Sequence, residues 1–155
     1  MAINSYSNLS IFGYNSKKEL GVVTMAFNPK QKILIIDDMS TMRKIIKNML
    51  GKMGCDQLDE AEDGIPAWDM IQKAHEAGMP YEFIVSDWNM PGMTGLDLLK
   101  KIREDERFKA LPFLMITAEA EQSNVIVAVK AGVSNFIVKP FSIVTLKEKI
   151  DKIFP

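Results

Sequence analysis

Short apolar segments alternate with longer amphipathic segments along most of this chain. The apolar segments are rich in β-branched residues and predict strands at 32–36, 57–61, 83–86, 113–117 and 135–138. Each is followed by a stretch with helical spacing, and these stretches predict helices at 40–53, 65–77, 94–103, 121–131 and 143–153. Ser40 is expected to cap the first helix, and Gly54, Gly78 and Gly132 are expected to end three helices in a left-handed conformation.

The regular alternation of strands and helices favours an α/β fold with a parallel sheet covered by helices on both faces. The segments 32–36, 83–86 and 113–117 are apolar on both sides, which is typical of central strands. The segment QLDEA at 57–61 is more polar, so we expect it at an edge of the sheet. The sequence thus predicts a doubly wound, five-stranded parallel sheet with five helices.

Residues 1–29 are rich in Asn, Ser and Gly and show no sustained period, so they are predicted to form an N-terminal tail. The folded domain is expected to cover residues 30–155. Met25 opens the segment MAFNPKQK directly before the first strand, which favours a native start there and a non-native extension before it. A genuine functional extension is the alternative that the sequence leaves open.

Composition narrows the classes of function. The chain has 155 residues, and its 19 Lys and Arg nearly balance its 20 Asp and Glu, which gives no support for binding to nucleic acid or membrane surfaces through bulk charge. Cys55 and His75 are the only cysteine and histidine, so the chain offers no internal disulfide and no zinc site of paired Cys and His. No apolar run is long enough for a transmembrane helix, and we expect a cytoplasmic protein.

Polar side chains stand at the carboxyl ends of four predicted strands. Asp37 and Asp38 follow the first strand and Asp87 follows the third, while Thr117 and Lys139 end the fourth and fifth. Ligands of open parallel sheets bind outside the carboxyl ends of the strands, so these five side chains are expected to share one crevice.

The predicted cluster suits phosphoryl chemistry. Carboxylates about 4 Å apart repel each other by about 4 kcal/mol at an effective dielectric constant of about 20, so the cluster should recruit a cation. Oxygen ligands suit Mg²⁺, and an ionised Asp87 beside it could attack phosphorus without a general base. Lys139 and Thr117 would then stabilise the oxygens of the phosphoryl group.

Each of these residues also has a simpler interpretation. Asp37 or Asp38 could only cap the following helix, Thr117 could be a turn residue, and Lys139 could be solvated. The joint pattern at four strand ends favours the phosphoryl hypothesis, because capping alone does not explain why all four ends are polar.

Five motifs carry a family resemblance: IIDDMSTMRKIIKNML, EAEDGIPAW, VSDWNMPGMTGLDLLKKIR, LMITAEAE and AGVSNFIVKPFS. They resemble the receiver domain of two-component response regulators, most closely the single-domain chemotaxis regulators of the CheY type. The resemblance covers residues 32–154. It implies a flavodoxin-like fold with strand order 2-1-3-4-5, and a monomer that acts as a signalling switch rather than a stand-alone enzyme.

The resemblance assigns roles within the predicted site. It implies that Asp87 accepts a phosphoryl group from a histidine kinase of the CheA type. It also implies that Asp37 and Asp38 bind Mg²⁺ together with the backbone carbonyl of Asn89, with Asp38 as a direct ligand. The bond before Pro140 is expected to be cis.

Two further roles follow from the resemblance. Thr117 and Phe136 would form a switch, although chemotaxis proteins often carry Tyr at the position of Phe136, and a plain core role for this ring stays open. Asn89 and Glu119 would tune dephosphorylation, in which a separate phosphatase is a further expected partner.

An output surface is predicted on the helix 121–131, the strand 135–138 and the helix 143–153. The helix 121–131 carries more apolar residues than one buried stripe requires, so some are expected to face outward unless the valines pack more deeply. By resemblance this surface binds a flagellar motor switch protein of the FliM type, although Glu121 replaces a basic residue of the family. Its predicted residues are Val125, Val129, Phe136, Val138, Lys149 and Lys152.

Two other functions remain open. One is a single-domain receiver or phosphate carrier in another two-component pathway. The other is a Mg²⁺-dependent phosphohydrolase with an aspartyl-phosphate intermediate. Hydrolases of the haloacid dehalogenase type require a second acidic residue two positions after the nucleophile, and this chain has Asn89 at that position. A nucleotide-binding fold is disfavoured because no glycine-rich loop follows the first strand.

Overall fold

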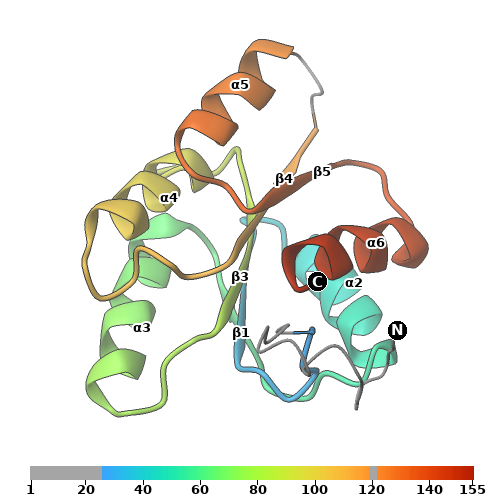
Figure 1. Ribbon diagram of the computed structural model, residues 1–155, viewed down its shortest axis with the longest axis horizontal. Coiled ribbons are helices and arrows are strands. Elements are labelled where there is room, and N and C mark those ends of the chain that lie inside the picture. The colour runs from blue at the N-terminus through green and yellow to red at the C-terminus, as the bar shows by residue number, and fades with distance from the viewer. Residues whose placement is uncertain (1–25, 119–121) are drawn as a thin grey trace, which may run out of the picture.

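The structure is a computed structural model that describes residues 26–118 and 122–155 (Figure 1). Strands and helices alternate along this part of the chain. The strands are β1 (Ile33–Ile36), β2 (Leu58–Ala61), β3 (Phe83–Asp87), β4 (Phe113–Thr117) and β5 (Asn135–Val138). The helices are α2 (Ser40–Lys52), α3 (Gly64–Glu76), α4 (Gly95–Glu104), α5 (Gln122–Lys130) and α6 (Ile143–Ile153). Every predicted element is present, and each described boundary lies within one residue of its predicted position.

The strands form one parallel sheet in the order β2-β1-β3-β4-β5, which confirms the predicted flavodoxin-like fold and the edge position of the polar strand. The order reverses its direction between β1 and β3, so the crevice at the carboxyl ends of these strands is the expected place for a ligand. The register aligns Ile36 with Ser86 and Asp87 with Ile116. Asp37 and Asp87 therefore emerge at the same level from adjacent strands.

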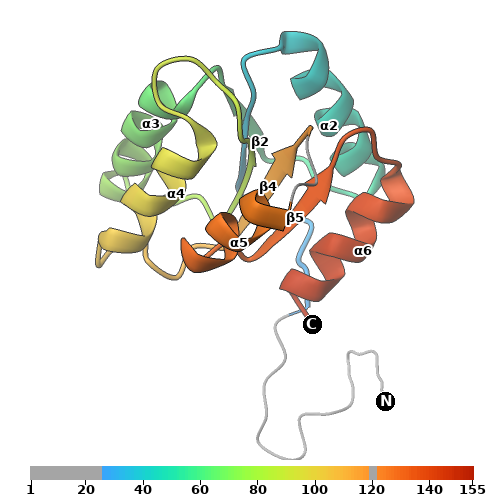
Figure 2. The same ribbon diagram turned by 90° about the horizontal axis from the view of Figure 1, so that it is seen from above.

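Both faces of the sheet are buried because helices cover them from two sides (Figures 1 and 2). Leu34 and Ile36 point into a core shared with α3 and α4, whereas Ile33 and Ile35 point into a second core shared with α2 and α6. This alternation explains why the central strands are apolar throughout. In β1 all four side chains are fully buried.

The ends of the helices confirm some predicted caps and correct one. Gly54, Gly78 and Gly132 have positive φ angles, as predicted for residues that end helices. The prediction that Ser40 caps α2 is wrong, because Met39 occupies the capping position and makes no capping hydrogen bond with its side chain. Instead, the carboxylate of Asp37 accepts the backbone N–H of Met39. This hydrogen bond fixes the residue before the helix and does not cap an amide of its first turn.

Phe27 lies within the range predicted as a tail, and its ring packs against the domain. The ring centroid lies 5.4 Å from that of Phe154 and 6.3 Å from that of Phe83. The second core therefore extends to residue 27 at the amino ends of the strands. Met25 and the residues before it lie outside the described part of the chain. Among the described helices, none combines the length and apolar character needed to cross a bilayer.

Candidate functional site: an acidic crevice at the carboxyl ends of the strands

The structure brings the five residues predicted at the strand ends to one edge of the sheet. Asp37 follows β1, Asp87 ends β3 and Thr117 ends β4. Lys139 follows β5, and its backbone N–H donates to the carbonyl of Thr117 at 2.8 Å. The bond between Lys139 and Pro140 is cis, as the resemblance implied.

The charged groups of the site are close together and mostly buried. Asp37 is fully buried and Asp87 is 6% exposed, whereas Asp38 is exposed. The three carboxylates can each offer an oxygen so that the oxygens lie within 4.8 Å of one another. The ammonium of Lys139 lies 3.1 Å from Asp87 Oδ1 and 3.5 Å from Asp37 Oδ2. One ammonium thus contacts two of the three carboxylates, and the described residues of the crevice keep an excess of negative charge.

The pKa values of the buried groups reflect this crowding. Burial raises the pKa of Asp87, and the nearby charge of Asp37 raises it further, while Lys139 only partly opposes both effects. Burial likewise raises the pKa of Asp37, although the N–H of Met39 and the charge of Lys139 act against it. For Lys139, burial favours the neutral amine, but the hydrogen bond and charge of Asp87 outweigh burial and raise the pKa. A further cation would relieve the cost of keeping both buried carboxylates ionised.

The turn after β3 is fixed tightly against Asp87. The backbone N–H of Gly95 donates to the carbonyl of Trp88 at 2.9 Å. A Cβ atom at Gly95 would clash with the carbonyl oxygen of Asp87, so only glycine lets the start of α4 approach this closely. Asn89 is exposed in this turn, and Trp88 is half-buried beside the acid. The role of Gly95 was not predicted from the sequence, although its place in a Pro- and Gly-containing turn was a usable signal.

The donors fit Mg²⁺. Ligand oxygens about 2.1 Å from an octahedral ion lie about 3.0 Å apart when adjacent and about 4.2 Å apart when opposite, so carboxylate oxygens within 4.8 Å of one another need to close by at most about 2 Å. Carboxylate oxygens are hard ligands of the kind that Mg²⁺ prefers, and the exposure of Asp38 leaves room for the water molecules that this ion retains. Asp37, Asp38 and Asp87 could therefore hold the ion, and the backbone carbonyl of Asn89 remains a predicted ligand.

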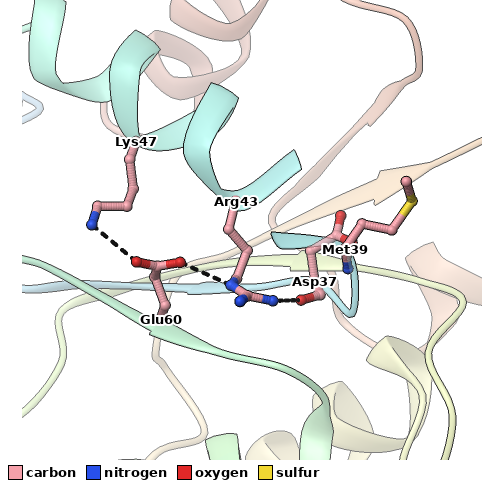
Figure 3. Close-up of polar contacts among 5 residues, drawn as sticks. All are labelled: Asp37, Met39, Arg43, Lys47 and Glu60. Carbon is pink, nitrogen blue, oxygen red and sulfur yellow. Dashed lines mark hydrogen bonds and ion pairs between the residues drawn. The ribbon is translucent and has the colours of Figure 1, made fainter. Parts of the chain in front are cut away.

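A group of charged residues next to Asp37 was not predicted from the sequence (Figure 3). Arg43 of α2 donates to the backbone carbonyl of Asp37 and to the carboxylate of Glu60 on β2. Lys47 donates to the other oxygen of Glu60. The available signal was the spacing of four between Arg43 and Lys47, which places both on one face of the helix. It could not reveal the contact of Arg43 with a backbone atom.

The predicted switch and output residues lie beside β5. Phe136 is partly buried, and the ammonium of Lys149 lies 5.2 Å from the centroid of its ring. In α5, Ala128 is buried while Ile126, Val127 and Val129 are exposed, so several apolar residues of this helix do face outward as predicted. Val125 and Val138 are partly buried and Lys152 is exposed. Glu119 and Glu121 lie outside the described residues, and the roles given to this group stay predictions.

Comparisons with known proteins identify the family of the chain. The family model described as "Response regulator receiver domain" matches residues 33–151. The chemotaxis protein CheY-3 of Vibrio cholerae serotype O1 is 55% identical over 127 residues, which cover 82% of this chain and 94% of that protein. The chemotaxis protein CheY of Pseudomonas aeruginosa is 54% identical over 79% of this chain and 95% of its own length.

Solved structures show the same fold. The chemotaxis response regulator CheY4 of Vibrio cholerae has a TM-score of 0.71 and 31% identity, covering 80% of this chain and 98% of that one. The receiver domain of the sensor histidine kinase PA1611 from Pseudomonas aeruginosa, with a magnesium ion coordinated in its active site cleft, has a TM-score of 0.68 and 26% identity over 81% and 98% of the two chains. The family model and the relatives together show that this chain belongs to the response regulator receiver domain family.

Proposed function

We propose that this protein is a chemotaxis response regulator that accepts a phosphoryl group on Asp87 from a histidine kinase of the CheA type. The observation that carries the proposal is the buried pair of Asp37 and Asp87 at the winding reversal of the sheet, with Asp38 and Lys139 beside it. Receiver domains bind Mg²⁺ at an acidic pocket and are signalling proteins rather than classical enzymes. The names of the relatives support the assignment to chemotaxis.

Asp87 is the nucleophile in this proposal. One of its carboxylate oxygens attacks the phosphorus atom of a phosphohistidine, the P–N bond breaks, and the imidazole of the kinase leaves with its electron pair. Mg²⁺ held by the three acids and the carbonyl of Asn89 would offset the charge of the incoming phosphoryl oxygens. Lys139 already contacts Asp87 Oδ1, so its ammonium can pair with an oxygen of the phosphoryl group once this group is bound to Asp87. The hydroxyl of Thr117 donates to a phosphoryl oxygen.

The output is a change at the surface around β5. Reorientation of Thr117 makes room behind β4, and the partly buried ring of Phe136 moves toward it. The surface of α5, β5 and α6 then binds a flagellar motor switch protein of the FliM type. The exposed Val129 on α5 and the basic Lys149 and Lys152 on α6 suit an amphipathic partner segment with acidic residues. Asn89 and Glu119 set the lifetime of the phosphorylated state.

Stoichiometric labelling tests the phosphoacceptor. Wild-type protein incubated with Mg²⁺ and acetyl phosphate should gain up to one phosphoryl group, which intact-mass spectrometry detects and hydroxylamine removes. Asp87→Asn should abolish the gain because an amide is not a nucleophile for this transfer. Asp69→Asn is the matched control, since this exposed aspartate pairs only with Lys73 on the surface of α3 among the described contacts.

Two results would contradict the proposal. Undiminished labelling of Asp87→Asn would remove Asp87 as the acceptor. Multiple turnover on ordinary phosphate esters would instead favour a phosphohydrolase. Binding of a peptide from a motor switch protein, measured with and without beryllofluoride and Mg²⁺, separates the proposed output from that of a phosphate carrier in another pathway.

A further inference from the structure

Arg43 of α2 contacts both the backbone of Asp37 and the side chain of Glu60 on β2, so it joins three parts of the fold (Figure 3). From α2 its Nη1 donates to the backbone carbonyl oxygen of Asp37 at 2.6 Å, and its Nε donates to Glu60 Oε1 on β2 at 2.8 Å. The side chain of Arg43 is only 13% exposed. A guanidinium held at two points and largely buried is a rigid element, in contrast to a surface lysine.

The contact with Arg43 is one of several hydrogen bonds and ion pairs that hold Asp37. Its backbone N–H donates to the carbonyl of Ala61 at 3.2 Å, and its Oδ1 accepts the N–H of Met39 at 2.9 Å. Its Oδ2 lies 3.5 Å from the ammonium of Lys139. The carbonyl bound by Arg43 belongs to the peptide unit between Asp37 and Asp38. The orientation of this peptide sets the direction in which the exposed Asp38 leaves the strand. Among the contacts of the described residues, only that of Arg43 involves the carbonyl oxygen of Asp37.

Glu60 offsets the positive charge of Arg43, which would otherwise repel a metal ion in the nearby crevice. Its carboxylate accepts from Arg43 and, at 2.9 Å, from Lys47 one helical turn further along α2. These hydrogen bonds, that of Lys47 first, lower the pKa of Glu60, so the carboxylate stays ionised. The positive charge of Arg43 is therefore offset locally, and what remains of its influence on the crevice is geometric.

We propose that Arg43 is a positioning residue for the divalent cation, holding the peptide between Asp37 and Asp38 so that both carboxylates face the same point. Glu60 anchors the guanidinium in this position. The inference rests on the proposed Mg²⁺ site and adds to it a residue that does not touch the ion. Residues that orient metal ligands from behind commonly change metal affinity about 10–100-fold when they are replaced.

Arg43→Lys tests geometry without changing charge. A lysine ammonium lacks the planar fork that reaches a backbone carbonyl and a carboxylate together, so the peptide loses its fixed orientation. We expect Mg²⁺ to bind about tenfold more weakly, measured by titration of Trp88 fluorescence in the folded protein. Arg43→Met should also weaken binding, even though removal of a positive charge by itself would strengthen the binding of a cation.

Lys47→Met is the matched control. It removes an equal charge from the same carboxylate of Glu60 without touching Asp37, so the affinity for Mg²⁺ should stay within about twofold of wild type. Wild-type affinity in Arg43→Lys, or an equal loss in Lys47→Met, would overturn the inference. Thermal unfolding without metal is recorded for each variant, so that a general loss of structure is recognised.

Glu60→Gln gives a second route if the Arg43 variants fail to fold. It keeps Arg43 but loosens its anchor and leaves its charge less offset, so Mg²⁺ should bind more weakly, and unchanged affinity would overturn the inference. The proposed Mg²⁺ site and the role of Arg43 can be overturned separately. A wild-type protein that does not bind Mg²⁺ overturns the proposed site and the role of Arg43 together, whereas normal wild-type binding with unchanged variants overturns only the role of Arg43.

Discussion

The two ends of strand β3 bury opposite kinds of side chain. At the amino end, Phe83 is fully buried, and its ring lies 5.2 Å from that of Phe154 and 6.3 Å from that of Phe27. At the carboxyl end, Asp87 is 6% exposed and lies beside the buried Asp37. One strand of five residues thus runs from an aromatic cluster to a crowded pair of acids.

Burial has opposite energetic consequences at these two ends. The aromatic rings gain stability by leaving water, whereas the pKa of each buried carboxylate is raised because its charged form is less favourable in the fold. The buried apolar end therefore contributes stability, and the buried acidic end can bind a ligand. The apolar end holds β3 in place. At the acidic end the buried charges are unfavourable, and a bound cation, alone or together with a phosphoryl group, would stabilise them.

The largest expected effect is at the amino end. Phe83→Ala should lower the free energy of unfolding by about 3–5 kcal/mol, since it leaves a cavity in the aromatic cluster. Urea denaturation measures this loss. Below the unfolding transition the remaining folded protein should bind Mg²⁺ with nearly unchanged affinity, because the acids lie at the other end of the strand.

Phe136→Ala is the control for ring size. This ring is only partly buried, so its removal should cost clearly less than removal of Phe83. Equal losses for the two variants, or a loss below about 1 kcal/mol for Phe83→Ala, would contradict the assignment of the amino end as the more stabilising region.

A smaller effect of opposite sign is expected at the carboxyl end. Asp87→Asn should raise the free energy of unfolding without metal by about 1 kcal/mol at pH 7, equivalent to roughly 4 °C in melting temperature. The reason is that the raised pKa of Asp87 marks a net cost of its charge, even with Lys139 beside it. Addition of Mg²⁺ should stabilise the wild type more than the variant. A variant less stable than wild type in EDTA would show that the contact with Lys139 outweighs the repulsion.

The contrast between the two ends was largely readable in the sequence. Apolar runs with polar last residues predicted the strands and which of them are central in the sheet. They also predicted that the strand ends bring together Asp37, Asp38, Asp87, Thr117 and Lys139. This works because a parallel sheet brings all carboxyl ends to one edge, so position along each strand translates directly into proximity.

The remaining details depend on contacts that no local pattern records. Ser40 is a good capping residue, but the helix begins at Ser40 itself, and Met39 stands in the capping position. Arg43 contacts a backbone carbonyl, and backbone atoms carry no sequence signal. The packing of Phe27 follows from where α6 ends, which brings Phe154 to the same corner of the sheet. Such features require the assembled fold.

The pH dependence of the Asp87→Asn effect gives the finest test of the comparison. A carboxylate whose pKa is raised in the fold stabilises it fully below the ordinary aspartate value of 3.8, and this contribution is lost as the pH rises through the raised value. Wild type and variant should therefore unfold at similar temperatures near pH 4, and the advantage of the variant should grow toward pH 7 and then level off. Asp37 and Asp87 titrate as a pair, so the midpoint of this change belongs to both.

The difference in stability between wild type and Asp87→Asn reports on the crevice, because groups that titrate elsewhere contribute equally to both proteins. The pKa of Glu60 is lowered by Lys47 and Arg43, and that of Asp105 is lowered to about 2 by Arg107, so both groups favour folding above the ordinary carboxylate range. Both are present in wild type and variant alike and drop out of the difference. Melting curves in EDTA at several pH values from 4 to 8 measure it. A difference that is constant over this range would mean that the charge of Asp87 carries no net cost in the fold, and the two ends of β3 would then differ in chemistry but not in their contribution to stability.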